Sequence, residues 1–150
     1  ILLCVTMVFL SGCESAPRFA LPWKKKDSNR EVRRALTMWT FSSREMPDGQ
    51  TESGFQGKAL FFAEGSDDAR PANGNVEVLI YELANAEWQL RRRFVSDGEA
   101  WKQNERETAL GTVYDIFVPH DTNSQRRYSI VLILQSDDGS RIKSPVAHLP

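Results

Sequence analysis

The sequence of 150 residues has little cysteine and little histidine, and these shortages exclude several kinds of protein. Both cysteines, Cys4 and Cys13, lie within the first thirteen residues, so residues 14–150 contain none. A disulfide-held fold and a cysteine-ligated metal site are therefore excluded for residues 14–150. A chain of this length can bury a hydrophobic core without such crosslinks. We therefore predict a single domain stabilised by its core.

The sequence also lacks the common short motifs of catalysis. It contains no G-x-S-x-G, no H-E-x-x-H, no Walker loop and no dinucleotide-binding G-x-G-x-x-G. The two histidines are His120, after a predicted strand, and His148, close to the last residue. A metal site formed by both histidines with Asp115 or Asp121 is one interpretation, and two surface-loop histidines are the simpler one. We predict no enzymatic activity, no metal and no cofactor.

No apolar run reaches the roughly 20 residues that a membrane-spanning helix needs. The longest apolar stretch, residues 1–10, is followed by Ser11, Gly12, Cys13 and the charged Glu14. The stretch is apolar on every side, whereas a core helix at a domain surface would be amphipathic. An apolar segment that ends in small residues is typical of a secretory signal peptide.

The residues Leu10-Ser11-Gly12-Cys13 resemble the bacterial lipobox, in which leucine and two small residues precede a cysteine. The resemblance implies that the signal peptidase recognises Leu10, Ser11 and Gly12 and cleaves before Cys13. Cys13 would then carry lipid on its sulfur and on its new amino group. We interpret residues 1–12 as a lipoprotein signal peptide truncated at its start, with an ordinary signal peptide as the alternative. This predicts a protein of the bacterial envelope that is held on a membrane through Cys13 and faces the periplasm or the exterior.

A formal net charge of −1 conceals an uneven charge distribution. Residues 18–34 carry seven basic and two acidic side chains, whereas residues 35–150 carry twelve basic and seventeen acidic ones. We predict that residues 13–34 are a lipidated cysteine and a flexible, proline-containing tether. Its basic residues either attract anionic headgroups or keep a solvated linker extended. The acidic remainder and the export signal argue against nucleic acid as a partner.

From residue 35 onward, short β-rich runs alternate with turn signals. At 36–41 we expect Leu36 and Met38 to face the core, with Phe41 as a further candidate. At 76–83 we expect Val76, Val78 and Ile80 to do so, with Leu83 as a further candidate. Further strands are expected at 58–63, 92–96, 112–118, 127–135 and 141–147, with the basic strand 92–96 at an edge and the apolar strand 127–135 in the centre of a sheet. An eighth strand is expected within 100–110. We expect loops at 42–57 and 64–75, a turn or short helix at 84–90, and an Asp-Gly hairpin turn at 136–140. The predicted fold is an all-β, antiparallel, immunoglobulin-like Greek-key β-sandwich of seven or eight strands over residues 35–150.

Two segments resemble known β-sandwich families. Residues 110–118, LGTVYDIFV, resemble a strand entry of fibronectin type III and related immunoglobulin-like domains, which implies that the Tyr114 hydroxyl caps a corner. Residues 71–78, PANGNVEV, resemble transthyretin-like and carboxypeptidase-regulatory-like modules, in which a loop leads into a long strand. Two strong strands follow Tyr114, where a fibronectin type III domain has one. The whole pattern is similar to bacterial lipoproteins common in planctomycetes, which implies a location and a fold but no particular activity.

Aromatic and charged clusters are the candidates for a binding surface. We expect these aromatic residues to lie in the core: Trp39, Phe61, Phe62 and Phe117. Trp88 and Trp101 stand in polar surroundings and are predicted to form an exposed contact surface. The arginines at 91–93 and 126–127 form either a basic patch or solvated edge-strand charge. The acidic clusters Glu64, Asp67, Asp68 and Asp137, Asp138 lack the ligand order of a calcium loop and are interpreted as solvated turns.

The resulting hypothesis is a membrane-anchored, non-enzymatic binding or scaffolding module for a protein or an envelope polysaccharide. One alternative is a small envelope hydrolase, which a cluster of His120 with Asp115 or Asp121 in a pocket would favour. Another is a ligand-carrying accessory of a transporter or secretion system, which a deep apolar cavity between the sheets would favour. An exposed patch around Trp88 or Trp101, or an open sheet edge, would favour the binding module.

Overall fold

The computed structural model describes residues 31–150 apart from residue 124. The predicted signal peptide, Cys13 and the tether up to residue 30 lie outside the described residues. The elements in order are β1 (Val32–Glu45), β2 (Thr51–Ala63), β3 (Gly74–Ala84), β4 (Glu87–Ser96), α1 (Gly98–Lys102), β5 (Glu105–Thr108), β6 (Gly111–Pro119), β7 (Tyr128–Ser136), β8 (Arg141–Lys143) and β9 (Ala147–Leu149). In this part of the chain, no helix is long and apolar enough to cross a membrane.

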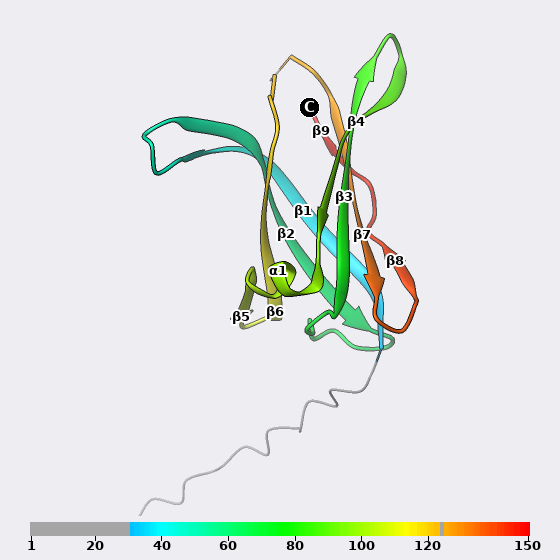
Figure 1. Cartoon of the computed structure of the whole chain (residues 1–150). Helices are drawn as coiled ribbons and strands as arrows, with labels where there is room; N and C mark the ends of the chain where they lie inside the picture. The colour runs from blue at the N-terminus through cyan, green and yellow to red at the C-terminus, as the bar shows by residue number, and fades with distance from the viewer. Residues whose placement is uncertain (1–30, 124) are drawn as a thin grey trace, which may run out of the picture.

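The strands form two antiparallel sheets that pack face to face (Figure 1). One sheet has the order β1-β2-β6-β5, and the other has the order β4-β3-β7-β8, with β9 also paired to β7. This arrangement matches the A-B-E-D and C′-C-F-G sheets of the immunoglobulin fold, with β8 and β9 together as the last strand. The predicted all-β sandwich is therefore confirmed.

The last strand is divided because Pro145 cannot donate a backbone hydrogen bond. Instead, the backbone N–H of Leu132 in β7 donates to the Ser144 hydroxyl at 3.1 Å. The predicted strand at 141–147 is thus two short strands, and the described chain has nine strands in all. At the other end, β1 begins at Val32, so residues 32–34 of the predicted tether belong to the sheet.

For strands that are buried on one face or on both faces, the sequence predicted the facing and the place in the sheet correctly. Val76, Val78 and Ile80 are buried on one face of β3, and β7 is a central strand that is buried from Tyr128 to Leu134. The turn between β7 and β8 contains Gly139 at a φ of 85°, as the Asp-Gly pair predicts. The basic strand β4 lies at an edge, also as predicted.

The predicted inward face of β1 was wrong by one residue. Leu36 and Met38 are 45% and 53% exposed, whereas Ala35 is buried and Trp39 and Phe41 pack against the core. A shift of one residue turns every side chain of a strand to the other face. Leu36 instead pairs with Leu60 of β2 on the outer face of the sheet, over a small satellite cluster.

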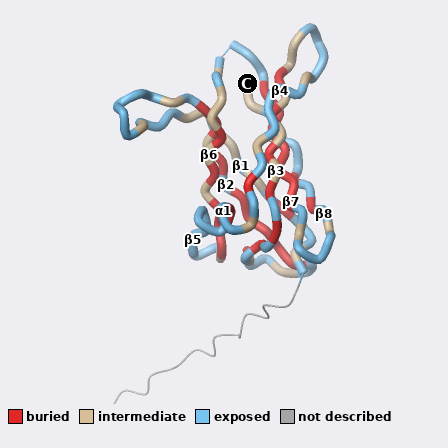
Figure 2. Tube along the Cα trace, in the orientation of Figure 1, coloured by how far each residue is buried: buried red, intermediate tan, exposed pale blue. Residues whose placement is uncertain are grey.

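Two predicted loops are hairpins that extend beyond the sandwich (Figures 1 and 2). β1 and β2 stay paired up to Glu45 and Thr51, so most of the predicted 42–57 loop is strand. Residues 42–45 and 51–53 are exposed or half-buried, so they show no apolar period that would indicate a strand. The segment at 84–90 contains the turn Asn85-Ala86, with φ values of 52° and 65°, which is the type I′ pattern of a tight hairpin.

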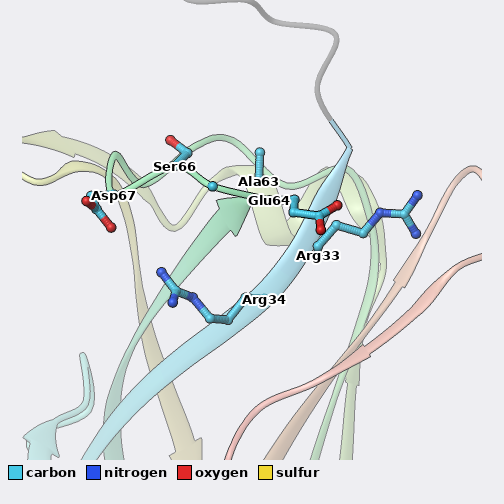
Figure 3. Close-up of a pocket in the computed structure, with 7 residues that line it drawn as sticks. Arg33, Arg34, Ala63, Glu64, Ser66 and Asp67 are labelled. Carbon is cyan, nitrogen blue, oxygen red and sulfur yellow. The ribbon is translucent and has the colours of Figure 1, made fainter.

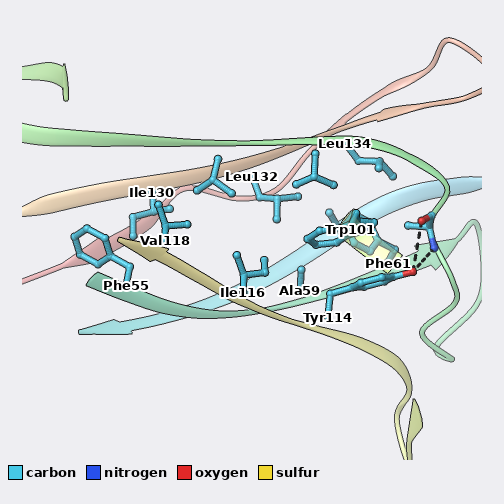
Figure 4. Close-up of a cluster of buried hydrophobic side chains, with 14 of the residues drawn as sticks. Phe55, Ala59, Phe61, Trp101, Tyr114, Ile116, Val118, Ile130, Leu132 and Leu134 are labelled. Carbon is cyan, nitrogen blue, oxygen red and sulfur yellow. Dashed lines mark hydrogen bonds between the residues drawn. The ribbon is translucent and has the colours of Figure 1, made fainter. Parts of the chain in front are cut away.

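The main core lies between the two sheets, with its aromatic residues at both ends (Figure 4). Phe61, Tyr114 and Trp101 pack at one end, and Phe55 and Tyr128 pack at the other. Of the aromatic residues predicted to be core, Phe61 and Phe62 are buried, whereas Trp39 and Phe117 are partly exposed. Burial raises the pKa of Tyr114, whose hydroxyl accepts a hydrogen bond from the Ala72 N–H at 2.9 Å.

The tyrosine corner of the immunoglobulin-like fold is formed by Tyr128 rather than by the predicted Tyr114. Tyr128 begins β7, and its hydroxyl accepts from the backbone N–H of Asn123, five residues upstream, at 3.1 Å. That is the geometry expected of a corner tyrosine at the start of the F strand. Tyr114 lies one strand earlier and anchors the loop before β3 instead. The correction also removes the mismatch in strand count, because one divided strand follows Tyr128.

Candidate functional site

Trp88 is exposed, as predicted, near the tip of the β3–β4 hairpin. The type I′ turn at Asn85-Ala86 places it on β4, opposite Leu83 of β3. Its side chain is 44% exposed. The hairpin tip lies at the opposite end of the sandwich from the start of β1 (Figure 1).

Trp101 does not contribute to an exposed surface, so this part of the predicted site was wrong. The residue is 1% exposed. Asp97 caps the short helix α1 by accepting a hydrogen bond from the Ala100 N–H at 2.8 Å, and the helix directs Trp101 between the sheets (Figure 4). The indole stacks on Tyr114 with ring centroids 4.3 Å apart. Trp101 is therefore a core residue.

Trp88 lies on a surface formed by β4, β3, β7 and β9 on the outer face of the five-stranded sheet. One rung of the ladder pairs Leu90, Tyr81, Ser129 and His148, and the adjacent outward rung pairs Trp88 with Leu83. We call these six residues the Trp88 platform. Leu90 is 51% exposed, and Tyr81 and Leu83 are half-buried. The platform is therefore a continuous, largely apolar area that is open to solvent.

Two contacts fix the position of His148 on the platform. Its Nδ1 lies 2.7 Å from the hydroxyl oxygen of Ser129. Its ring centroid lies 5.7 Å from that of Trp88, with the planes tilted by 38°. The sequence separates Trp88 from His148 by sixty residues, so no local pattern could have identified this pair. His148 is therefore a candidate binding residue that sequence reasoning missed.

A cluster of arginines surrounds the buried carboxylate of Glu82 on the inward face of β3, opposite to the platform. Glu82, rather than the expected Leu83, is the last inward-facing residue of β3. Its side chain is 7% exposed. Arg126 contacts its Oε1 at 2.8 Å and Arg91 contacts the same atom at 3.4 Å. A buried carboxylate requires such partners. The two arginine runs, which are 33 residues apart in the sequence, thus meet at one carboxylate.

His120 lies in an open depression of about 400 Å³ at the same end of the sandwich. The lining residues are Thr51, Glu52, Ser53, Arg92, Pro119, His120 and Asp121. The imidazole packs against the rings of Phe55 and Tyr128 at 5.5 and 5.7 Å. Asp121 shares the depression, as one prediction required, but Asp115 does not. Asp115 lies on the outer face of the other sheet, where Lys58 and Arg106 hold it at 3.0 and 2.8 Å.

The burial of His120 predicts a pH-dependent contribution to stability. Burial lowers its pKa below the ordinary value, and the nearby Arg92 lowers it further. As the pH falls below about 6.5, the unfolded chain takes up a proton that the folded chain resists, so folding loses free energy. We expect the wild type to lose more stability between pH 7.5 and 5.5 than a His120→Gln variant does. Urea unfolding at both pH values measures the difference, and equal losses would contradict the prediction.

The remaining acidic candidates are turn and loop residues. Glu64 and Asp67 lie beside Arg33 and Arg34 around an open depression near the start of β1 (Figure 3). Asp138 accepts a hydrogen bond from the Ser140 N–H at 2.8 Å in the β7–β8 turn, and hydrogen bonds with Ser140 lower its pKa. Within residues 31–150 other than 124, no group of three or more His, Asp or Glu side chains could hold a metal ion.

A cavity of about 180 Å³ lies between the two sheets beside α1. Its apolar lining includes Val76, Val78, Phe94, Trp101 and Ile116. Pockets for small-molecule ligands usually measure about 300–1,000 Å³. The cavity is therefore small for a carried ligand, and the Trp88 platform is the better candidate site. No known protein family, curated protein or solved structure matches the chain.

Proposed function

We propose that this protein is a lipid-anchored bacterial envelope lipoprotein and that its β-sandwich is a non-enzymatic binding module. The observation that carries the proposal is the Trp88 platform. Trp88 and Leu90 are about half exposed on one sheet face, beside the imidazole of His148. Contiguous apolar surface of this kind commonly marks an interaction site. The lipobox resemblance at Leu10 to Cys13 supports the envelope location.

The position of the platform also supports a binding role. β1 begins at one end of the sandwich, and the β3–β4 hairpin tip lies at the other (Figure 1). An anchor upstream of β1 would therefore join the domain at the end remote from the platform. Such a geometry leaves Trp88 available to a partner in the surrounding envelope.

A small hydrolase is the second candidate, because His120 and Asp121 share a depression with two hydroxyl side chains, Thr51 and Ser53. The imidazole, however, makes its ring contacts with the core aromatics Phe55 and Tyr128, which gives it a structural role. The positive charge of Arg92 and the burial also disfavour its protonated form. No comparable packing role explains the exposed side chains of Trp88 and Leu90. The binding module is therefore the first candidate function and the hydrolase the second.

The anchor and the platform can be tested together in native membranes. We expect the wild type to incorporate labelled palmitate and to sediment with membranes, and Cys13→Ala to lose the label and most of the membrane fraction. Crosslinking from native membranes should recover an envelope component with the wild type, and Trp88→Ala should lose it. Loss of one interface tryptophan commonly costs 2 kcal/mol or more, which is about thirtyfold in affinity.

Two variants serve as matched controls. Cys4→Ala removes the other cysteine, which lies in the predicted signal peptide, and should leave labelling unchanged. Met38→Ala removes a similarly exposed apolar side chain on the other sheet, and should leave capture unchanged. If Cys13→Ala keeps its label, the anchor is wrong. If Met38→Ala loses the partner and Trp88→Ala retains it, binding takes place on the other sheet face.

A further inference from the structure

A groove of about 570 Å³ lies along one side of the sandwich, near the start of β1. β1 is the edge strand of one sheet and β8 is the edge strand of the other, and the groove lies between them. Its lining comes from residues 33–36 of β1, Phe62 of β2 and residues 143–145, which end β8 and follow it. We call it the β1–β8 groove. Its volume is within the range of about 300–1,000 Å³ that is usual for small-molecule ligands.

The charged side chains that line the β1–β8 groove are all positive. They are Arg33, Arg34 and Lys143, and no aspartate or glutamate is among the described residues that line it. Arg33 forms an exposed ion pair with Glu31. Arg34 and Lys143 form no ion pair with another described residue. An anionic group in the groove would therefore meet two cations that no described carboxylate neutralises.

Most of the remaining lining is apolar. Phe62 is 8% exposed, and the Cζ of Arg34 lies 4.8 Å from the centroid of its ring. Leu36 is 45% exposed, and Pro145 lines the groove from the other sheet. The groove thus presents cations beside accessible hydrocarbon. This combination suits an amphiphile with an anionic head and an apolar body.

The groove lies at the end of the domain that the predicted anchor would hold near a membrane. Arg33 is the second residue of β1, at the end where the described chain begins (Figure 1). Residues 14–30 separate this chain from Cys13. That length of chain spans at most about 60 Å when fully extended. A lipid on Cys13 would therefore keep the groove within reach of the bilayer surface.

The bilayer is also the source of anions that this chain does not supply to the groove. Residues 14–30 carry five basic and two acidic side chains, so like charge repels them from the groove. Glu64 and Asp67 lie around a neighbouring depression and form no ion pair with the arginines there (Figure 3). A membrane that contains anionic lipids presents negative headgroups directly above hydrocarbon.

We propose that the β1–β8 groove binds an anionic phospholipid of the membrane. The phosphate lies on Arg34 and Lys143, and the glycerol with the upper part of the acyl chains lies against Leu36 and Phe62. Guanidinium groups pair with phosphate through two parallel hydrogen bonds. The bound lipid would hold this end of the domain on the bilayer and leave the Trp88 platform facing away from it. The inference rests on the proposed function, because the anchor brings the groove to the membrane.

Backbone amide chemical shifts of the purified, unlipidated Cys13→Ser chain test this site with four soluble probes. Dihexanoyl phosphatidylglycerol, added as monomers, has an anionic headgroup and short acyl chains. Dihexanoyl phosphatidylcholine has the same chains and no net charge, glycerol 3-phosphate has no chains, and polyglutamate has carboxylates without phosphate. We expect phosphatidylglycerol to shift the amides of Leu36, Phe62 and Lys143, and the other three probes to shift them much less.

Single substitutions locate the binding in the groove. Arg34→Gln and Lys143→Gln should each weaken phosphatidylglycerol binding about fivefold, and Leu36→Ala about threefold. Arg106→Gln is the matched control for the charge, because Arg106 is an exposed arginine on β5, at the other edge of the same sheet. Leu90→Ala is the control for the leucine, because Leu90 is 51% exposed on the Trp88 platform. Both controls should bind as the wild type does.

Each probe can overturn one part of the inference. Equal shifts with phosphatidylcholine would exclude a role for the cations, and equal shifts with glycerol 3-phosphate would exclude a role for the apolar lining. Equal shifts with polyglutamate would show that the groove takes an acidic polymer rather than a lipid. If Arg34→Gln and Lys143→Gln both bind as the wild type does, the lipid does not bind in the groove.

The lipid is added from solution, so this experiment does not depend on the anchor. If the groove amides do not shift but Cys13→Ala loses its palmitate label, the groove inference is wrong and the anchored binding module stands. If the groove amides shift but Cys13→Ala keeps its label, the anchor is wrong and the groove still binds the lipid. Circular dichroism and the unfolding midpoint of each variant check that the fold is retained.

Discussion

Replacement of Trp101 by alanine is expected to lower the free energy of unfolding by about 3–5 kcal/mol. The indole is 1% exposed, stacks on Tyr114 at 4.3 Å and meets the edge of Phe61 at 6.0 Å. Its removal leaves a cavity next to the existing space of about 180 Å³, so neighbouring side chains cannot close around it easily. A loss of this size is a large share of the 5–15 kcal/mol that typically stabilises a domain.

Urea unfolding followed by circular dichroism measures this effect, with Trp88→Ala as the matched tryptophan control. Trp88 is 44% exposed, so its replacement should change stability by about 1 kcal/mol or less. Trp101→Phe extends the test if the alanine variant does not fold. It keeps an aromatic ring and removes the indole N–H, which has no hydrogen-bond partner among the described residues. Similar losses for Trp101→Ala and Trp88→Ala would contradict the assignment of Trp101 to the core.

The two tryptophans show why burial could not be predicted from local polarity alone. Both stand among charged residues in the sequence. Trp101, however, belongs to a five-residue helix in which it is the buried side chain, and so short a helix carries no readable period. Its burial depends on the Asp97 cap and on the position of Tyr114 in another strand. Trp88 lies on the outer face of an edge strand and is 44% exposed, as its polar surroundings in the sequence predicted.

Strands were predictable where a clear period exists. In β3 the alternation of Val76, Val78 and Ile80 gave the correct face, and β7 was apolar enough to be central. In β1 both faces carry apolar residues, because Leu36 covers the satellite cluster outside while Ala35 faces the core. The alternation of apolar and polar residues therefore did not show which face of β1 is inward, and the wrong face was predicted.

The candidate site was predictable only in part, because its residues meet through strand pairing. Trp88 was identified from its surroundings, but its neighbour His148 comes from the last strand. In the same way, Glu82 brings together Arg91 and Arg126, which the sequence presents as two separate basic runs. A single sequence does not specify register between distant strands, so such pairs emerge only with the fold.

Replacement of Gly74 by alanine is the second large effect that we expect, with a loss of about 3 kcal/mol or more in the free energy of unfolding. Gly74 begins β3 at a φ of +130°, a conformation that residues with a Cβ rarely adopt. A Cβ would lie 2.1 Å from the carbonyl oxygen of Gln135 in β7. Backbone strain of about 1–3 kcal/mol and overpacking of about 1–3 kcal/mol therefore act together.

Gly139→Ala is the matched control, because it separates backbone strain from the close approach of two strands. Gly139 also has a positive φ, of +85°, but nothing lies within 4 Å of the position that its Cβ would occupy. It should therefore lose only the strain contribution, about 1 kcal/mol. The difference between the two variants in urea unfolding measures the contact between β3 and β7. Since that pairing also places Tyr81 beside Ser129 under the Trp88 platform, Gly74→Ala should weaken partner binding as well, whereas Gly139→Ala should not. Equal losses of stability would mean that the two strands do not approach each other as closely at Gly74.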